Sequence, residues 1–206
     1  HFLGNQAFEG IPIRALGKTR DLIAENGDTY ADALYRLLGD WMRGTQPVPP
    51  SEVIGPGSLL VGGRTLTAMP MAGHTEADLV LLDHRTGVVI AGDVAFLDRA
   101  PTMPDADLAK WRESLAALEA LEPAAVVPGH GPFDRERRSL AQTRAYIDWL
   151  EATLKDAAGR GLDMVETMAL PIPDRFAAMG AQPGEFERSV VHLFPAFETA
   201  ALPLRN

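Results

Sequence analysis

The segment between residues 57 and 130 constrains the fold more than any other part of the chain. It carries short apolar runs separated by glycine-containing turns, a pattern typical of β-hairpins. Such hairpins pair neighbouring strands, so the segment predicts a sheet. The runs expected to pair are 59–61 with 64–69, across Gly62-Gly63, and 78–82 with 88–91, across a turn at 85–87.

Helical periodicity surrounds these strands, and a further apolar strand is expected at 124–127. The alternation of strands and helices predicts an α/β fold with helices against one face of the sheet. After residue 158 we expect short helices between proline-rich turns. Helices are expected within 1–9 and over 18–25, 30–42, 107–121 and 135–158, with a brief strand at 11–13. One apolar face is formed by Ala33, Leu34, Leu37, Leu38 and Trp41, and another by Leu108, Trp111, Leu115 and Leu118.

Composition narrows the chemistry that the chain can perform. Its 206 residues are 46% hydrophobic, enough for a sizeable core. The absence of cysteine excludes disulfides, thiolate metal ligands and cysteine nucleophiles. Any metal ion must therefore be held by His, Asp or Glu.

Three short glycine-flanked segments each carry one side chain that can bind a metal ion. They are Gly73-His74-Thr75, Ala91-Gly92-Asp93 and Pro128-Gly129-His130-Gly131, and each follows a predicted strand or hairpin. Functional side chains gather at strand ends, where loops meet a rigid scaffold. Two imidazoles and a carboxylate suit zinc, iron or manganese. The sequence therefore predicts a metal site at these three residues.

Each of these residues also has a plainer interpretation when it is taken alone. A single His or Asp after Gly is more often a turn residue, a surface residue or a helix cap than a ligand. The metal interpretation rests on the occurrence of three such sites within one domain. Two other histidines serve as contrasts: we expect His84 to be exposed in a turn, and His192 to be packed or partly exposed within a helix.

Two residues near the expected site can also be interpreted either as functional or as structural. Arg99 could line a substrate cleft, or it could pair with Asp98, Asp105 or Asp107 on the surface. Trp111 continues the apolar stripe of its helix, so we expect it in the core and not at a substrate site.

In order and spacing the three segments resemble the metallo-β-lactamase superfamily of metal-dependent hydrolases. The motifs of that family are an early His-x-His-x-Asp-His run, then Gly-His-Thr, then Gly-Asp after a strand, then Pro-Gly-His-Gly. The last three stand here at 73–75, 92–93 and 128–131. The stretch from His1 to Phe8 resembles what starts at the last His of the early run. On this resemblance His1 is a fourth ligand, and the preceding His-x-His-x-Asp is missing from the chain.

The resemblance implies a metallo-β-lactamase-like αβ/βα sandwich with its N-terminal portion missing. We expect the C-terminal part of that domain over residues 1–158. A helical C-terminal extension is expected over 159–206, packed on the same domain. The segments 96–101, 107–111 and 194–198 also resemble a bacterial subgroup, the quinoprotein relay-system zinc metallohydrolases.

The resemblance also assigns roles to the ligands. His74 would bind the first of two zinc ions, Asp93 would bridge both ions as the catalytic carboxylate, and His1 and His130 would bind the second. A metal-bound hydroxide would then cleave an ester, thioester, lactone or amide type bond in a small molecule. Iron or manganese could take the place of zinc.

Two alternatives to a hydrolase stay open: a mononuclear iron enzyme similar to sulfur dioxygenases, and a truncated fold remnant without catalysis. The expected partner is a small-molecule substrate. A net charge of −9 disfavours nucleic acid, and no apolar run reaches the roughly 18 residues of a membrane span. The oligomeric state is open. The compartment is cytoplasm or periplasm, and the resemblance favours the periplasm.

Overall fold

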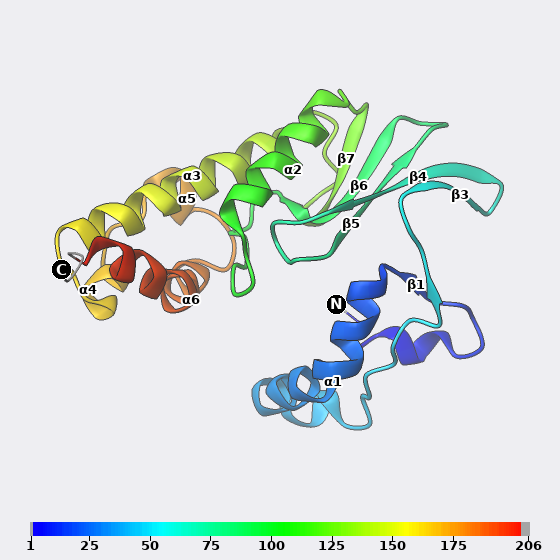
Figure 1. Cartoon of the computed structure of the whole chain (residues 1–206), viewed down its shortest axis with the longest axis horizontal. Coiled ribbons are helices and arrows are strands. Elements are labelled where there is room, and N and C mark those ends of the chain that lie inside the picture. Colours follow the sequence, from blue (N-terminus) through cyan, green and yellow to red (C-terminus); the bar gives the residue numbers. More distant parts are fainter. Residues whose placement is uncertain (1, 203–206) are drawn as a thin grey trace.

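The computed structural model describes residues 2–202, which form a five-stranded sheet, a two-stranded sheet and helices around them (Figure 1). This mixed α/β architecture confirms the fold class expected from the sequence. The elements are η1 (Asn5–Phe8), β1 (Arg14–Ala15), α1 (Gly17–Leu38), η2 (Gly39–Met42), β2 (Glu52–Val53), β3 (Gly57–Val61), β4 (Arg64–Met71), β5 (Asp78–Asp83), β6 (Val88–Phe96), α2 (Leu108–Ala120), β7 (Ala125–His130), α3 (Arg138–Gly159), α4 (Met164–Met168), α5 (Asp174–Ala177) and α6 (Gly184–Ala201).

The larger sheet has the strand order β3-β4-β5-β6-β7. The pairs β3/β4, β4/β5 and β5/β6 are antiparallel, and β6/β7 is parallel, with α2 between them in the chain. Both predicted hairpins are therefore confirmed. Gly62 and Gly63 close the first one with φ values of 54° and 73°, which a side chain would disfavour.

The second hairpin turn is held by a buried carboxylate. Asp83 accepts hydrogen bonds from the side chains of Arg64 and Thr86 and, at 3.2 Å, from the backbone N–H of Arg85. The hydrogen bond from Arg64 is the largest cause that lowers the pKa of Asp83 to about 2. The turn thus keeps an ionised carboxylate at neutral pH, while His84 between these residues remains exposed.

Helices α2 and α3 cover one face of the larger sheet, and α4 to α6 lie beyond them (Figure 1). The apolar stripe predicted for α2 is confirmed, because Leu108, Trp111, Leu115 and Leu118 are all buried. Trp111 is fully buried, and its Nε1 donates to the carbonyl of Val94 at 2.8 Å. The indole therefore links α2 to β6.

Helix α3 begins three residues later than predicted, at Arg138 instead of Arg135. Arg137 has a left-handed backbone with φ of 60°, which cannot continue a helix. Asp134 instead folds the preceding loop back onto β7, with backbone hydrogen bonds to Val126 of 2.8 and 2.9 Å. The side chain of Asp134 accepts from the backbone N–H of Ser139 at 2.7 Å and from its hydroxyl at 2.6 Å.

The helix break predicted around residues 26–29 is wrong, because α1 runs without interruption from Gly17 to Leu38. Gly27 is buried in it, and a Cβ at that position would lie 2.7 Å from Cβ of Pro47. Tertiary packing against a neighbouring segment therefore overrides a locally poor helix former. The strand expected at 11–13 is displaced to Arg14–Ala15, where it pairs with β2.

Only short helices were expected in the C-terminal part, and the structure differs from this expectation. Helix α6 extends over 18 residues and passes through Pro195. Its buried residues include Phe186, Val190 and Phe194, which belong to the main hydrophobic core together with residues of α3. This apolar stripe holds α6 as one element despite the proline. The proposed domain division at residue 158 stays a prediction.

The apolar face predicted for residues 33–41 is largely exposed. Trp41 is 91% exposed and Leu37 is 76% exposed. Within residues 2–202, α1 contacts η2 but no strand of the larger sheet to a comparable extent. A helical apolar stripe in this sequence therefore does not by itself mark the core. No helix among the described residues is long and apolar enough to cross a membrane.

We expect Asp134→Ala to lower the free energy of unfolding by about 2–3 kcal/mol at pH 7, because it leaves the donors of Ser139 without a charged acceptor. Burial would raise the pKa of Asp134, but its hydrogen bonds from Ser139 lower it overall. The stabilisation is therefore lost as the pH falls below the ordinary Asp value of 3.8. Urea unfolding measures the effect. The exposed Asp156→Ala should change stability by less than about 1 kcal/mol, and equal effects of both variants would contradict this role.

Candidate metal centre

The fold brings His74, Asp93 and His130 together, although 56 residues separate the first from the last. Nε2 of His74 lies 3.9 Å from Oδ2 of Asp93, and Nε2 of His130 lies 3.6 Å from Oδ1. The two imidazoles thus face opposite oxygens of one carboxylate. The Asp93 side chain is only 12% exposed.

Asp93 is presented by an irregularity in the pairing of β6 with β7. Gly92 pairs with Pro128, and Phe96 pairs with His130, so four steps along β6 match two steps along β7. Extra residues in one strand bend it and redirect side chains, and such bulges are common beside functional sites. Gly92 adopts φ of 53°, which glycine allows without strain.

Glycine at the end of β7, at positions 129 and 131, is required by close approach to β6. A Cβ on Gly129 would lie 2.7 Å from the backbone N of Asp93 and would overlap Oδ1 of the same residue. A Cβ on Gly131 would lie 2.8 Å from Cβ of Leu97. The end of β7 can therefore place His130 beside Asp93 only because these positions lack side chains.

His130 is fixed by ring stacking and by the backbone. Its ring lies nearly parallel to that of Phe96, with centroids 5.2 Å apart and an interplanar angle of 17°. Its carbonyl accepts a 2.9 Å hydrogen bond from the N–H of Leu97. Burial lowers the pKa of His130 from its ordinary 6.5, and this outweighs the opposite influence of the Asp93 charge. The neutral imidazole, the form that binds metals, is thereby favoured.

His74 is oriented by Asp78 and Trp111. Asp78 accepts from the backbone N–H of His74 at 3.1 Å and from the hydroxyl of Thr75 at 2.6 Å. Oδ1 of Asp78 lies 3.8 Å from Nδ1 of His74. The ring meets that of Trp111 edge-on at 5.5 Å. Carboxylates on the far ring nitrogen of a histidine commonly orient it toward a metal.

The sequence interpretation overlooked Asp78 and Phe96. Asp78 lies three residues after Thr75, a spacing at which Asp commonly accepts hydrogen bonds from a preceding turn, so a local signal existed. From the sequence, Phe96 could be recognised only as the end of an apolar strand. Its contact with both imidazoles, 5.9 Å from the ring of His74 and 5.2 Å from that of His130, follows only from the fold.

The donor set fits a metal ion in its chemistry and in its pairwise spacing. Two ligands that lie about 2.1 Å from a tetrahedral zinc ion are separated by about 3.4 Å. The separations of 3.6 and 3.9 Å are close to that value. Even so, residues 2–202 contain no group of three or more His, Asp or Glu side chains that could hold a metal ion by themselves. The predicted fourth ligand, His1, lies outside the described residues.

Of the other residues named from the sequence, His84 lies as expected, His192 is more exposed than expected, and Arg99 has an unexpected partner. His84 is exposed and its Nε2 lies 2.6 Å from the hydroxyl of Thr67. His192 is exposed on α6. Arg99 does not pair with a nearby aspartate, as one interpretation expected, because its Nη2 donates to Oε1 of Glu185 at 3.2 Å. This partner lies 86 residues further along the chain.

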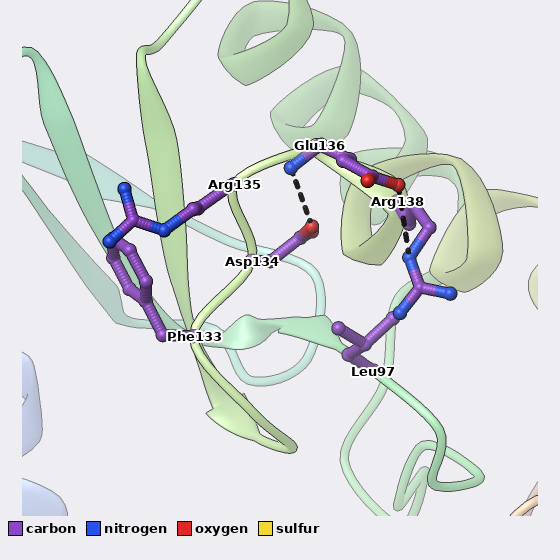
Figure 2. A pocket seen from close by; sticks show the side chains of 6 residues that line it. All are labelled: Leu97, Phe133, Asp134, Arg135, Glu136 and Arg138. Atoms are coloured by element: carbon purple, nitrogen blue, oxygen red, sulfur yellow. Dashed lines mark hydrogen bonds and ion pairs between the residues drawn. The ribbon is translucent and has the colours of Figure 1, made fainter.

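A pocket of about 320 Å³ opens next to the end of β7, where His130 lies (Figure 2). Figure 2 shows the guanidinium of Arg135 over the ring of Phe133, with 5.2 Å from Cζ to the ring centroid. Arg138 lies across the pocket and pairs with Glu136 at 3.9 Å. The three predicted ligands are not among the pocket's lining residues, so the pocket is a neighbour of the site and not its centre.

We expect Gly129→Ala to destabilise the protein by about 1–3 kcal/mol, because the new methyl group forces β6 and the His130 turn apart. Bound metal per chain should fall as well. Urea unfolding and elemental analysis provide the two measurements. Gly159→Ala is the matched control, since a Cβ there meets nothing within 4 Å. A Gly129→Ala protein with unchanged stability and metal content would show that the close approach is unimportant.

The lowered pKa of His130 predicts a pH dependence of stability in the metal-free protein. As the pH falls through 6.5, the unfolded chain takes up the proton before the folded one does. The free energy of unfolding should therefore decrease over this range. His130→Asn should show a weaker decrease in urea unfolding between about pH 7.5 and 5.5, whereas the exposed His192→Asn should behave like the wild type. An unchanged slope in His130→Asn would be the contrary result.

Comparison with known proteins identifies the family of the chain. The sequence model of the Metallo-beta-lactamase superfamily matches residues 9–130, more than half of the chain. Probable metallo-hydrolase YqjP from Bacillus subtilis (strain 168) is 27% identical over 104 residues. These residues are 40% of this chain and 33% of that protein.

Solved structures share the fold. A metallo-beta-lactamase family protein from Thermus thermophilus matches with a TM-score of 0.69 and 20% identity, covering 98% of this chain and 72% of that one. A metallo-beta-lactamase from Pontibacter korlensis matches with a TM-score of 0.55 and 21% identity over 71% of this chain. The chain spans 62% of the latter and about a third of the Bacillus protein. The chain therefore belongs to the Metallo-beta-lactamase superfamily.

Proposed function

We propose that the protein is a metal-dependent hydrolase acting on an ester, thioester, lactone or amide type bond in a small molecule. The observation that supports this most directly is the approach of two imidazole Nε2 atoms to opposite oxygens of Asp93. Family membership adds support, since the fold generally binds metal ions, usually zinc. Zinc is the metal that we propose here.

Each residue of the site has a separate proposed part in metal binding. Asp93 offers one oxygen toward each imidazole, which is the arrangement a bridging carboxylate requires. Asp78 lies on the Nδ1 side of the His74 ring, so Nε2 of the same ring faces Asp93. Burial keeps His130 neutral near physiological pH. We propose His1 as a further ligand.

Zinc held by these ligands would supply a water of near-neutral pKa and would polarise a carbonyl oxygen. The protein contributes apolar shielding on one side of the ligands. Phe96 and Trp111 are both buried, with ring centroids 6.2 Å apart, and each contacts the ring of His74. This wall excludes solvent from the inner side, so a substrate must approach from the side where His130 remains partly exposed.

A mononuclear iron oxygenase is the second candidate function. Two histidines and one carboxylate, the donors that converge here, are also the ligand set of many non-haem iron enzymes. Elemental analysis separates the two candidates. One iron per chain without zinc would favour the oxygenase, and zinc together with hydrolysis of an ester or lactone panel would favour the hydrolase.

We predict that Asp93→Ala removes nearly all bound metal, because the Asp93 carboxylate faces the Nε2 atoms of both His74 and His130. Hydrolysis of any substrate in the panel should fall by at least about 100-fold, in line with the loss of metal catalysis. Elemental analysis and initial rates measure the two effects.

His84→Ala is the control, because His84 is exposed and its Nε2 contacts Thr67. This variant should keep both metal content and rate. Full metal content in Asp93→Ala would refute the role proposed for the carboxylate.

A further inference from the structure

A cluster of polar side chains joins the end of β6 to the start of α6. Arg99 follows β6, Thr102 lies in the next loop, and Glu185 belongs to the first turn of α6. Parallel bridging between Arg99 and Gly180, with hydrogen bonds of 2.9 and 3.0 Å around it, fixes the two segments to each other. The cluster is therefore part of the folded scaffold.

The cluster lies beside the candidate metal centre. Phe96 pairs with His130 in the sheet register, and the N–H of Leu97 donates to the His130 carbonyl at 2.9 Å. Arg99 follows only two residues later. The backbone segment that carries Arg99 therefore runs beside the end of β7, where His130 lies.

The guanidinium of Arg99 is held in one orientation by three acceptors. Nη1 donates to the carbonyl of Ala100 at 3.2 Å and to the hydroxyl of Thr102 at 3.3 Å, and Nη2 donates to Oε1 of Glu185 at 3.2 Å. Thr102 in turn donates to the same Oε1 at 2.9 Å. A guanidinium has five N–H donors. Within residues 2–202, Nε and one N–H of Nη2 therefore have no acceptor.

Glu185 is retained at an energetic cost. It is only 7% exposed, and its Oε2 is buried without a hydrogen-bond partner among the described residues. Burying a carboxylate oxygen without a hydrogen-bond partner is unfavourable, so its presence in a folded protein calls for an explanation. The other oxygen of Glu185, Oε1, accepts from Arg99, whose side chain remains 29% exposed and has the two further donors just named. Such a fork of N–H donors matches the two oxygens of a carboxylate.

We propose that Arg99 is a specificity residue that binds a carboxylate group of the substrate, and that Glu185 and Thr102 are positioning residues that orient its guanidinium. This rests on the proposed function, since it assigns the substrate class of that same site: a small molecule with a carboxylate away from the bond that is cleaved. Helix α6 then contributes to substrate choice through Glu185.

The test compares succinate with butyrate, which have four carbons each and differ by one carboxylate. Calorimetric titration into the zinc-loaded protein measures both affinities. We expect succinate to bind at least about tenfold more tightly, equivalent to about 1.4 kcal/mol, because its second carboxylate meets Arg99. Arg99→Gln should bring the two affinities together, and Arg99→Lys should keep part of the difference. Equal affinities in the wild type, or a preference that survives in Arg99→Gln, would overturn the proposal.

Further variants separate positioning from folding. Glu185→Ala should lose the succinate preference with unchanged butyrate affinity and zinc content, and Glu185→Gln should restore it, because an amide oxygen can still accept from Arg99 and Thr102. Arg138→Gln, in the neighbouring pocket of Figure 2, is the matched control and should leave the preference intact. Loss of the preference in Arg138→Gln would place the anion site in that pocket and contradict the assignment to Arg99.

The same preparations distinguish this inference from the proposed function. Hydrolysis of neutral p-nitrophenyl butyrate does not involve a second carboxylate. A protein that hydrolyses this ester but shows no succinate preference contradicts the inference alone. A protein that prefers succinate through Arg99 but hydrolyses no member of an ester, thioester and lactone panel contradicts the proposed hydrolase alone.

Discussion

The parallel pairing of β6 with β7 is the interaction on which the rest of the candidate site depends. It aligns Gly92 with Pro128 and Phe96 with His130, and the surplus of residues on β6 turns Asp93 toward the same edge. Gly129 permits the two strands to approach closely enough for the carboxylate to face the imidazole. The stacked ring of Phe96 then fixes His130. A sheet ladder thus sets the positions of two of the proposed ligands.

The other contributions attach to this pair of strands. His74 reaches Asp93 from the loop after β4, where Asp78 and Trp111 hold its ring. Trp111 is itself tied to β6 through the Val94 carbonyl. Arg99, just beyond β6, is held by Glu185 of α6. Helices on one face of the sheet and the C-terminal helix therefore all fix side chains around one strand end.

The sequence was a good guide wherever structure is local. The hairpins and the α2 stripe could be predicted, because turn chemistry and periodicity involve residues close together in the chain. Asp93 was expected after a strand but lies inside β6. Features that depend on distant partners could not be predicted. Gly27 stays helical because Pro47 packs on it, and Arg99 pairs with a glutamate 86 residues away. Phe96 gave no sign in the sequence that it contacts both imidazoles. Trp41 shows the opposite error. It belongs to an apolar face with helical periodicity that was predicted from the sequence, but that face is largely exposed.

The central claim is that His74, Asp93 and His130 hold one metal centre. Anomalous diffraction at the zinc absorption edge, from crystals of the protein grown with zinc, tests it most directly. The account predicts strong anomalous density within coordination distance of Asp93, with Nε2 of His130 ligating on the side of Oδ1 and Nε2 of His74 on the side of Oδ2. A zinc peak that is bound elsewhere, with these three side chains left uncoordinated, would contradict the account.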